Sequence, residues 1–278
     1  MNDIPKIRPP TVAGFFYPRE KLELEREIAI YLENAPKIKI PGRIIGLIAP
    51  HAGYMYSAGV AARAYRQIID QEPQVVAVIS PSHHEYFTEI SVYDGHAYST
   101  PLGIIPVDTE LAMALADINP QFILSEKGHR FDEHALEVQL PLLQEVLNDF
   151  KLLPIVLGEH SYDNVITLAE GLATVLKERN ALIVASSDLS HFYDARKARL
   201  LDNLVIENIK KFDEDKLFDD LQSGKCEMCG GGPVVAAMKA CKLLGANKSE
   251  FLIYRNSGDI SGNMQEVVGY LSALFYQH

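Results

Sequence analysis

Histidines that follow apolar runs are the residues of this sequence best suited to chemistry. Three such runs, 43–49, 75–80 and 181–186, are each followed by one or two of them: His51, His83, His84 and His191. Ligands of open α/β sheets bind outside the carboxyl ends of strands, so we expect these side chains to meet at one sheet edge. Their intervals are too long for a local finger-type metal motif, so the fold itself must assemble the site.

Cys229 is a further residue with suitable chemistry. It precedes three glycines and Pro233, which let the backbone approach a ligand closely and then start a helix. The positive end of that helix predicts a thiolate at Cys229, the form that binds metals or attacks as a nucleophile. Cys226 leaves open a Cys-x-x-Cys redox pair or half of a zinc site, whereas we expect Cys241 to be a buried apolar residue.

Carboxylates accompany these candidates. Asp188 lies three residues before His191, where it could fix the tautomer of that histidine or simply form a turn. The segment Asp132-Glu133-His134 predicts the start of a helix over 133–148, with Asp132 as its cap. On that helix His134 and Glu137 would share one face and either line the site or form an interface pair.

Two tyrosines follow His51 closely, Tyr54 and Tyr56. Both could reach a pocket built around that histidine. Metal-binding histidines usually donate a hydrogen bond from the N–H of their second ring nitrogen to a supporting group, so neighbours of this kind matter even where they do not touch the metal. Whether such residues contact a metal or only support its ligands stays open at this level.

The elements that must position these residues follow from the apolar pattern. Continuous apolar runs are typical of strands covered on both faces, and they occupy residues 43–49, 75–80, 152–157, 181–186, 250–255 and 267–275. Amphipathic helix candidates lie between them, at 22–34, 58–69, 109–116, 133–148, 162–177, 195–210, 216–222 and 233–244. This alternation predicts an α/β protein, a single domain over 1–278 with a mostly parallel or mixed sheet sandwiched by helices.

Composition narrows the class of protein. The 278 residues carry a formal net charge of −11, which argues against nucleic acid as a partner. The uncharged stretch 44–62 contains Pro50, Gly53 and Ser57, which favour a strand, a turn and a helix start over a membrane span. The first ten residues show no apolar signal-peptide core, so we expect a cytoplasmic protein. Phosphate-loop, dinucleotide-fingerprint and nucleophile-elbow motifs are missing from the sequence.

Several short motifs, in order along nearly the whole chain, resemble the Memo family of the AmmeMemoRadiSam system protein B type. They are Pro50-His51-Ala52-Gly53-Tyr54, Pro81-Ser82-His83-His84, Asp132-Glu133-His134, Ser186-Ser187-Asp188-Leu189-Ser190-His191 and Cys229-Gly230. The resemblance implies a fold similar to class III extradiol dioxygenases, non-haem iron enzymes with two histidine ligands and one glutamate. It further implies partnership with a radical S-adenosylmethionine protein and an AMMECR-type protein, and animal members are described as binding copper or iron.

Carried over to this sequence, the resemblance implies that His51 and His83 are metal ligands, that Cys229 replaces the glutamate ligand, and that His191 is the acid/base. We therefore expect a non-haem Fe(II)-dependent redox enzyme acting on an unknown small molecule, with Asp188 also catalytic and Cu or Zn as alternative metals. The expected support residues around the ligands are His84, His134, Glu133 and Tyr54.

Three alternatives stay open. The first is a non-enzymatic protein that binds copper or iron for a partner. The second is an interaction protein that reuses a dioxygenase-like cleft. The third is a zinc hydrolase or a thiol enzyme with Cys229 as nucleophile and His191 as its base.

Overall fold

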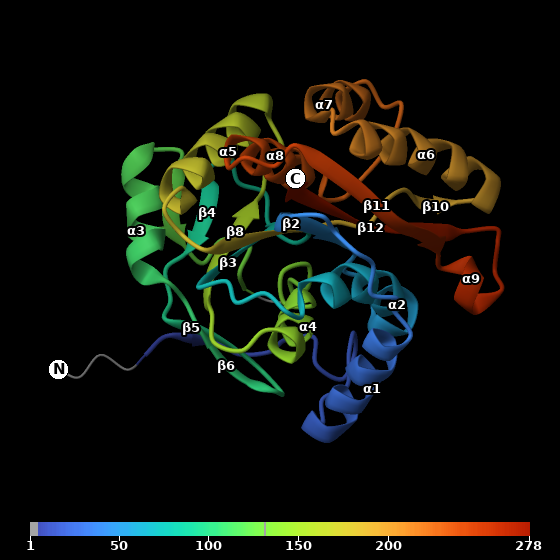
Figure 1. Cartoon of the computed structure of the whole chain (residues 1–278), viewed down its shortest axis with the longest axis horizontal. Helices are drawn as coiled ribbons and strands as arrows, with labels where there is room; N and C mark the ends of the chain where they lie inside the picture. The colour runs from blue at the N-terminus through green and yellow to red at the C-terminus, as the bar shows by residue number, and fades with distance from the viewer. Residues whose placement is uncertain (1–4, 131) are drawn as a thin grey trace.

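A mixed sheet forms the centre of the computed structural model, which describes residues 5–130 and 132–278. In this part of the chain the main sheet has nine strands in the order β10-β12-β2-β9-β3-β8-β4-β7, with β11 beside β12 (Figure 1). A smaller sheet has the order β1-β5-β6. The α/β architecture with a mixed sheet between helices is therefore confirmed. The first four residues, part of the stretch in which we expect no signal peptide, lie outside the described residues.

The bounds of the elements are as follows. The strands are β1 (Ile7–Arg8), β2 (Arg43–Ala49), β3 (Val75–Pro81), β4 (Ile90–Tyr93), β5 (Ala97–Thr100), β6 (Gly103–Pro106), β7 (Phe122–Ser125), β8 (Lys151–Leu157), β9 (Ala181–Ser186), β10 (His191–Tyr193), β11 (Lys248–Asn256) and β12 (Val267–Gln277). The helices are α1 (Lys21–Glu33), α2 (Tyr54–Tyr65), η1 (Arg66–Ile68), α3 (Thr109–Ile118), α4 (Gln139–Val146), α5 (Tyr162–Leu176), α6 (Ala195–Lys211), α7 (Glu214–Gln222), α8 (Gly231–Leu243) and α9 (Gly258–Ser261).

Four neighbouring parallel strands, β2, β9, β3 and β8, make up the middle of the main sheet. Every residue of β3 and of β9 is buried, which explains why both appear in the sequence as unbroken apolar runs. Since these strands run in the same direction, their carboxyl ends share one edge of the sheet. His51, His83, Asp188 and His160 follow these four ends within a few residues.

Helices cover both faces of the main sheet. One face packs against α3, α5, α6, α7 and α8, and the other against α1, α2, α4 and the small sheet, as Figure 1 shows for α5 and α8 opposite α1, α2 and α4. The side chains of β3 alternate accordingly: Val75, Ala77 and Ile79 enter the first core, whereas Val76 and Val78 enter the second. Two buried cores hold the central strands rigidly, and with them the loops at their ends.

The helix predicted over 133–148 is wrong at its start. Residues 133 and 134 have no regular structure, residues 135–138 form a turn, and α4 begins only at Gln139. Pro141 lacks a backbone N–H and therefore suits the first turn of a helix, so the helix starts shortly before it. Asp132 is consequently not a helix cap, and Glu133 and His134 belong to a loop.

The uncharged stretch 44–62 contains β2 from its second residue onward, a turn and the first three quarters of α2, as its sequence predicts. Helix α2 starts at Tyr54, four residues before the predicted start, and places that tyrosine in its first turn. Among the described residues, no helix has both the length and the apolar character needed to cross a bilayer.

Candidate metal centre

His51, His83 and Cys229 come together at the carboxyl edge of the central strands. The rings of the two histidines meet edge to face with their centroids 5.2 Å apart. The sulfur of Cys229 lies 3.1 Å from Nε2 of His51. One donor atom from each of the three residues lies within 4.8 Å of the others, which is close enough for one metal ion to reach all three.

Both imidazoles are held through Nδ1. The Nδ1 atom of His83 lies 3.0 Å from Oε1 of Glu133, and that of His51 lies 2.9 Å from the hydroxyl of Ser186. Glu133 also accepts the backbone N–H of His83, which fixes the loop as well as the ring. Nδ1 contacts of this kind are typical of metal-binding histidines and leave Nε2 for the metal. The arrangement therefore fits a bound metal, with Glu133 placed to orient the ring of His83.

The surroundings of Cys229 favour a protonated thiol in the metal-free protein, in contrast to the thiolate that the helix dipole predicts. Burial raises the pKa of the thiol well above its ordinary value, and the nearby Asp188 carboxylate raises it further. The backbone N–H of Asp188, 3.2 Å from the sulfur, opposes this shift without cancelling it. Desolvation thus outweighs the dipole of α8, which begins two residues later. A metal must displace the thiol proton in order to bind.

The other two cysteines are outside this donor group. Cys226 is buried and lines the neighbouring cavity. Cys241 is buried in α8, as the sequence predicts, and its sulfur faces Gly46 of β2. The Cys-x-x-Cys spacing therefore reflects a loop that leads into a helix, with Cys229 in the donor group and Cys226 beside it.

His134 adds a third imidazole to the cluster. Its ring stacks on that of His83 at 4.6 Å and lies 5.3 Å from that of His51. The ring of Phe16 packs against that of His134, with centroids 4.5 Å apart. The positions of the histidines in the sequence do not predict this contact. Burial, and then the charge of His83, lower the pKa of His134 to about 4, so its ring is neutral near pH 7. His84 is exposed, and so is His83.

Glu137 belongs to a buried ion pair beside the site. Its carboxylate accepts hydrogen bonds from Arg8, from Tyr17 at 2.5 Å and from the backbone N–H of Thr11. Arg8 also donates to the carbonyl oxygen of Glu133 at 2.7 Å. The sequence allows Glu137 either to line the site or to form an interface pair, and the structure shows the interface pair, with Arg8 as its partner. Through Arg8, this pair attaches the N-terminal segment to the loop that carries Glu133.

Asp188 acts on His51 through the backbone. Its carboxylate accepts the N–H of His51 at 2.8 Å. Burial raises the pKa of this carboxyl to about 7, although hydrogen bonds from the backbone of His51 and Ala52 oppose the shift. Within residues 5–130 and 132–278, no hydrogen bond joins Asp188 to the ring of His191. The expected orientation of His191 by Asp188 is therefore not seen, and the carboxylate holds the His51 loop.

Tyr54 also supports the site from a distance. It is fully buried, and its hydroxyl donates to the carbonyl oxygen of Val138 at 2.9 Å. This bond links the start of α2, just after His51, to the turn that leads into α4. Tyr54 therefore braces two segments that carry site residues.

A cavity of about 400 Å³ adjoins Cys229. His191 and His160 both line it, between apolar walls that include Leu189, Phe218 and Met228. Burial lowers the pKa of His160 to about 4 and also lowers that of His191. His160 was not among the predicted site residues, although it lies three residues beyond the predicted strand 152–157 and the rule applied to the other histidines would have found it.

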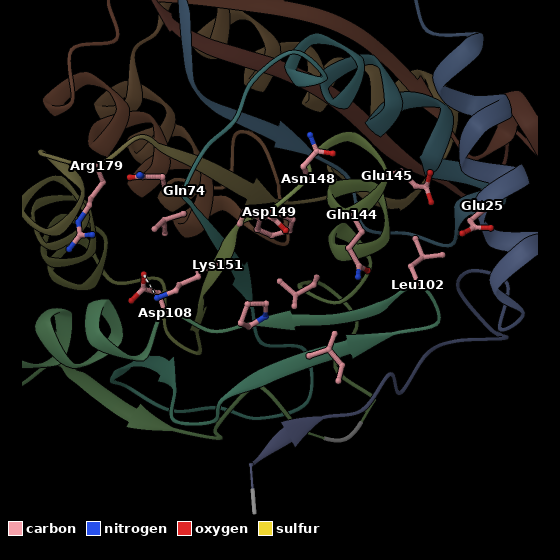
Figure 2. A pocket seen from close by; sticks show the side chains of 15 residues that line it. Glu25, Gln74, Leu102, Asp108, Gln144, Glu145, Asn148, Asp149, Lys151 and Arg179 are labelled. Carbon is pink, nitrogen blue, oxygen red and sulfur yellow. Dashed lines mark ion pairs between the residues drawn. The ribbon is translucent and has the colours of Figure 1, made fainter.

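A larger cavity, of about 680 Å³, lies elsewhere (Figure 2). Val75 and Lys151, the first residues of β3 and β8, line it, so it opens at the amino ends of the central strands. Its other lining residues include Glu25, Asp149 and Arg179, and none of the predicted site residues. The candidate site residues thus lie at the opposite edge of the sheet, where Cys229 and His191 line the smaller cavity.

Comparison with known protein sequences assigns the chain to a family. The sequence profile described as "Memo-like protein" matches residues 8–274. A "MEMO1 family protein" of Methanobrevibacter smithii is 38% identical over 97% of this chain and 99% of its own length. One of Aquifex aeolicus is likewise 38% identical over 97% and 99%. The chain therefore belongs to the Memo-like family, as its motifs predict.

A solved structure supports the fold alone. The crystal structure of the uncharacterized protein JW3007 from Escherichia coli K12 superposes with a TM-score of 0.57 at 15% identity. The match covers 84% of this chain and 99% of that one. The two proteins therefore share their architecture over most of both chains.

Proposed function

We propose that this protein is a non-haem iron-dependent redox enzyme of the Memo type, with Fe(II) held by His51, His83 and Cys229. The observation that supports the proposal is the approach of three donor atoms, two imidazole nitrogens and one sulfur, to within 4.8 Å of one another. Such a mixed set suits Fe(II), copper or zinc. Three protein ligands also leave a position open for a small molecule, as catalytic metal sites require.

The cavity beside Cys229 supplies the place for a substrate, with apolar side chains and two half-buried histidines in its walls. Because its pKa is lowered, His191 is neutral at pH 7 and able to accept a proton from a bound molecule. A bound iron would supply Lewis-acid and one-electron redox chemistry at this position. In this proposal Asp188 keeps the His51 loop in place, and Glu133 orients the ring of His83.

The metal content of anaerobically purified protein tests the proposal. We expect near-stoichiometric iron in the unmodified protein and its loss in His51→Ala and Cys229→Ser. Cys226→Ala is the matched control, because it removes a buried thiol that lines the same cavity but lies outside the donor group. Equal iron in all four proteins, or none in any of them after reconstitution with Fe(II), would contradict the proposed site.

Turnover tests the role of His191. His191→Ala leaves all three proposed ligands in place, so we expect it to keep its metal and lose O₂-dependent turnover of catechols or other oxidisable small molecules. Turnover retained in this variant would remove the proposed proton-transfer role.

The thiol among the ligands favours a second candidate, a protein that holds copper for a partner, because sulfur donors prefer softer metals than carboxylates do. Copper in place of iron in the purified protein, with tight binding that Cys229→Ser abolishes and no turnover, would favour this function over the first.

A further inference from the structure

A chain of buried polar side chains lies behind His51. Tyr65 of α2, Gln139 of α4 and Ser186 of β9 are each fully buried, as is His51 itself. The hydroxyl of Tyr65 lies 2.8 Å from Oε1 of Gln139, Nε2 of Gln139 lies 2.7 Å from the hydroxyl of Ser186, and that hydroxyl lies 2.9 Å from Nδ1 of His51. Three elements therefore converge on one ring nitrogen.

The orientation of Gln139 follows from a backbone carbonyl. The side-chain atom assigned as Nε2 lies 3.0 Å from the carbonyl oxygen of Pro50. A carbonyl oxygen only accepts, so the atom that faces it must be the amide nitrogen. One N–H of Gln139 then points to Pro50 and the other to Ser186. Its oxygen faces Tyr65, whose hydroxyl donates to it.

A backbone carbonyl also fixes the direction in which the Ser186 hydroxyl donates its proton. Oγ of Ser186 lies 2.6 Å from the carbonyl oxygen of Ala135, which again only accepts. A serine hydroxyl has one proton to donate and two lone pairs that accept. With its proton on Ala135, Ser186 accepts from Gln139 with one lone pair, and only the other remains for His51. The short contact with His51 is a hydrogen bond only if Nδ1 of His51 carries a proton.

We propose that Ser186 is a positioning residue that fixes His51 as the Nδ1–H tautomer, with Gln139 and Tyr65 holding Ser186 in its accepting role. The bare Nε2 of His51 then faces the sulfur of Cys229 at 3.1 Å, where the thiol proton fits between them in the metal-free protein. A neutral histidine has only one lone-pair nitrogen, and this network selects which one it is. The tautomer stands on the hydrogen bonds alone; its consequence for metal binding rests on the proposed function.

Nitrogen NMR of the metal-free, full-length protein with ¹⁵N-labelled histidine tests the tautomer directly. His51→Ala identifies the His51 signals by their loss. We expect the Nδ1 of His51 to be protonated and its Nε2 to be unprotonated. A protonated Nε2 with a bare Nδ1 would overturn the proposal, and this measurement on the unmodified protein does not depend on whether any variant folds.

Ser186→Ala removes the acceptor. We expect the His51 signals to change to a mixture of the two tautomers, and Zn²⁺ affinity to fall by about 10- to 100-fold, the usual effect of losing a group that orients a metal-binding histidine. Ser272→Ala is the matched control, because Ser272 is also a fully buried strand serine and its hydroxyl has no partner among the described residues. It should leave both readouts unchanged.

The two proposals fail in different ways. An Nδ1–H tautomer in a protein that binds no metal would support the role of Ser186 and contradict the proposed function. An Nε2–H tautomer in a protein that binds metal tightly would do the reverse. A pure Nδ1–H tautomer that persists in folded Ser186→Ala would show that other groups set it, and would overturn the role of Ser186.

Discussion

Single buried side chains at this site act mainly by accepting or donating one hydrogen bond in a fixed direction. Glu133 binds both the ring and the backbone of His83, and Asp188 binds the backbone of His51. Removing such a partner leaves a buried polar group unsatisfied, which costs more than the hydrogen bond itself contributes. The residues around the donor atoms therefore combine support of the site with a contribution to stability.

His129 is a buried polar side chain away from the candidate metal centre. Its buried imidazole makes the stability of the protein depend on pH. Its Nδ1 lies 2.6 Å from the hydroxyl of Tyr98. Burial, and then the charge of Arg8, lower the pKa of His129 to about 3. Unfolding restores the ordinary value of about 6.5. Between these two values the unfolded chain binds one more proton than the folded chain, so the free energy of unfolding falls as the pH falls below 6.5.

For one such group the expected slope is about 1.4 kcal/mol per pH unit. We expect His129→Gln to be less stable at pH 7 but to lose less stability between pH 6.5 and 4, in urea unfolding of the metal-free protein. The exposed His96 provides the control, since His96→Gln should keep the slope of the unmodified protein. An unchanged slope in His129→Gln would show that other groups carry the acid sensitivity.

At the scale of elements, the junction before α8 sets the position of Cys229. A Cβ atom at Gly230 would lie 2.3 Å from the carbonyl oxygen of Ser186 and 2.7 Å from Cβ of Ser187. The backbone of Gly230 has a φ of −100°, so lack of space, and not backbone conformation, requires glycine here. The Cys229 loop thus packs directly on the end of β9.

Gly230→Ala should therefore push the Cys229 loop away from β9. We expect a loss of about 1–3 kcal/mol in stability, typical of overpacking a tight site, and a weaker affinity for Zn²⁺. Gly59→Ala in α2 is the control, because its added Cβ would approach nothing closer than 3.8 Å and alanine favours a helix. Zn²⁺ affinity equal in Gly230→Ala and Gly59→Ala, measured by calorimetric titration, would show that the loop tolerates the change.

Elements differ in how far the sequence predicts them. Strands such as β3 and β9 were predictable because burial on both faces leaves an unbroken apolar run. The four-residue strands β4 and β7 were not, because their pairing partners lie far along the chain and their length gives little pattern. The start of α4 was misplaced because an acidic residue such as Glu133 is typical of the first turn of a helix. In the structure its carboxylate instead contacts the ring of His83.

At the scale of the whole molecule, the convergence of His51 and His83 was predictable because parallel strands share one carboxyl edge. The network behind His51 was not, since Tyr65, Gln139 and Ser186 come from two helices and a strand whose packing only the tertiary structure defines. His160 lies between these two cases. It follows the end of β8, so the rule that ligands bind at the carboxyl ends of strands applies to it, but it was overlooked. Strand order therefore predicts the candidate ligands better than it predicts the groups around them.

Metal binding should also stabilise the molecule as a whole. The donors are at positions 51, 83 and 229, so only the folded chain brings them within 4.8 Å. A ligand that binds only the folded state stabilises it by about 2.7 kcal/mol at a free concentration 100 times its Kd. For a chain of this length that corresponds to a rise of about 5 °C in Tm.

Scanning calorimetry with Zn²⁺, which is redox-silent, measures this rise. We expect it in the unmodified protein and in Cys226→Ala, and not in Cys229→Ser. Mg²⁺ at the same concentration should have no effect, because it prefers oxygen ligands and nitrogen and sulfur predominate at this site. A rise of the same size in Cys229→Ser would show that the thiol does not hold the stabilising metal, because that variant lacks the thiol while both imidazoles remain.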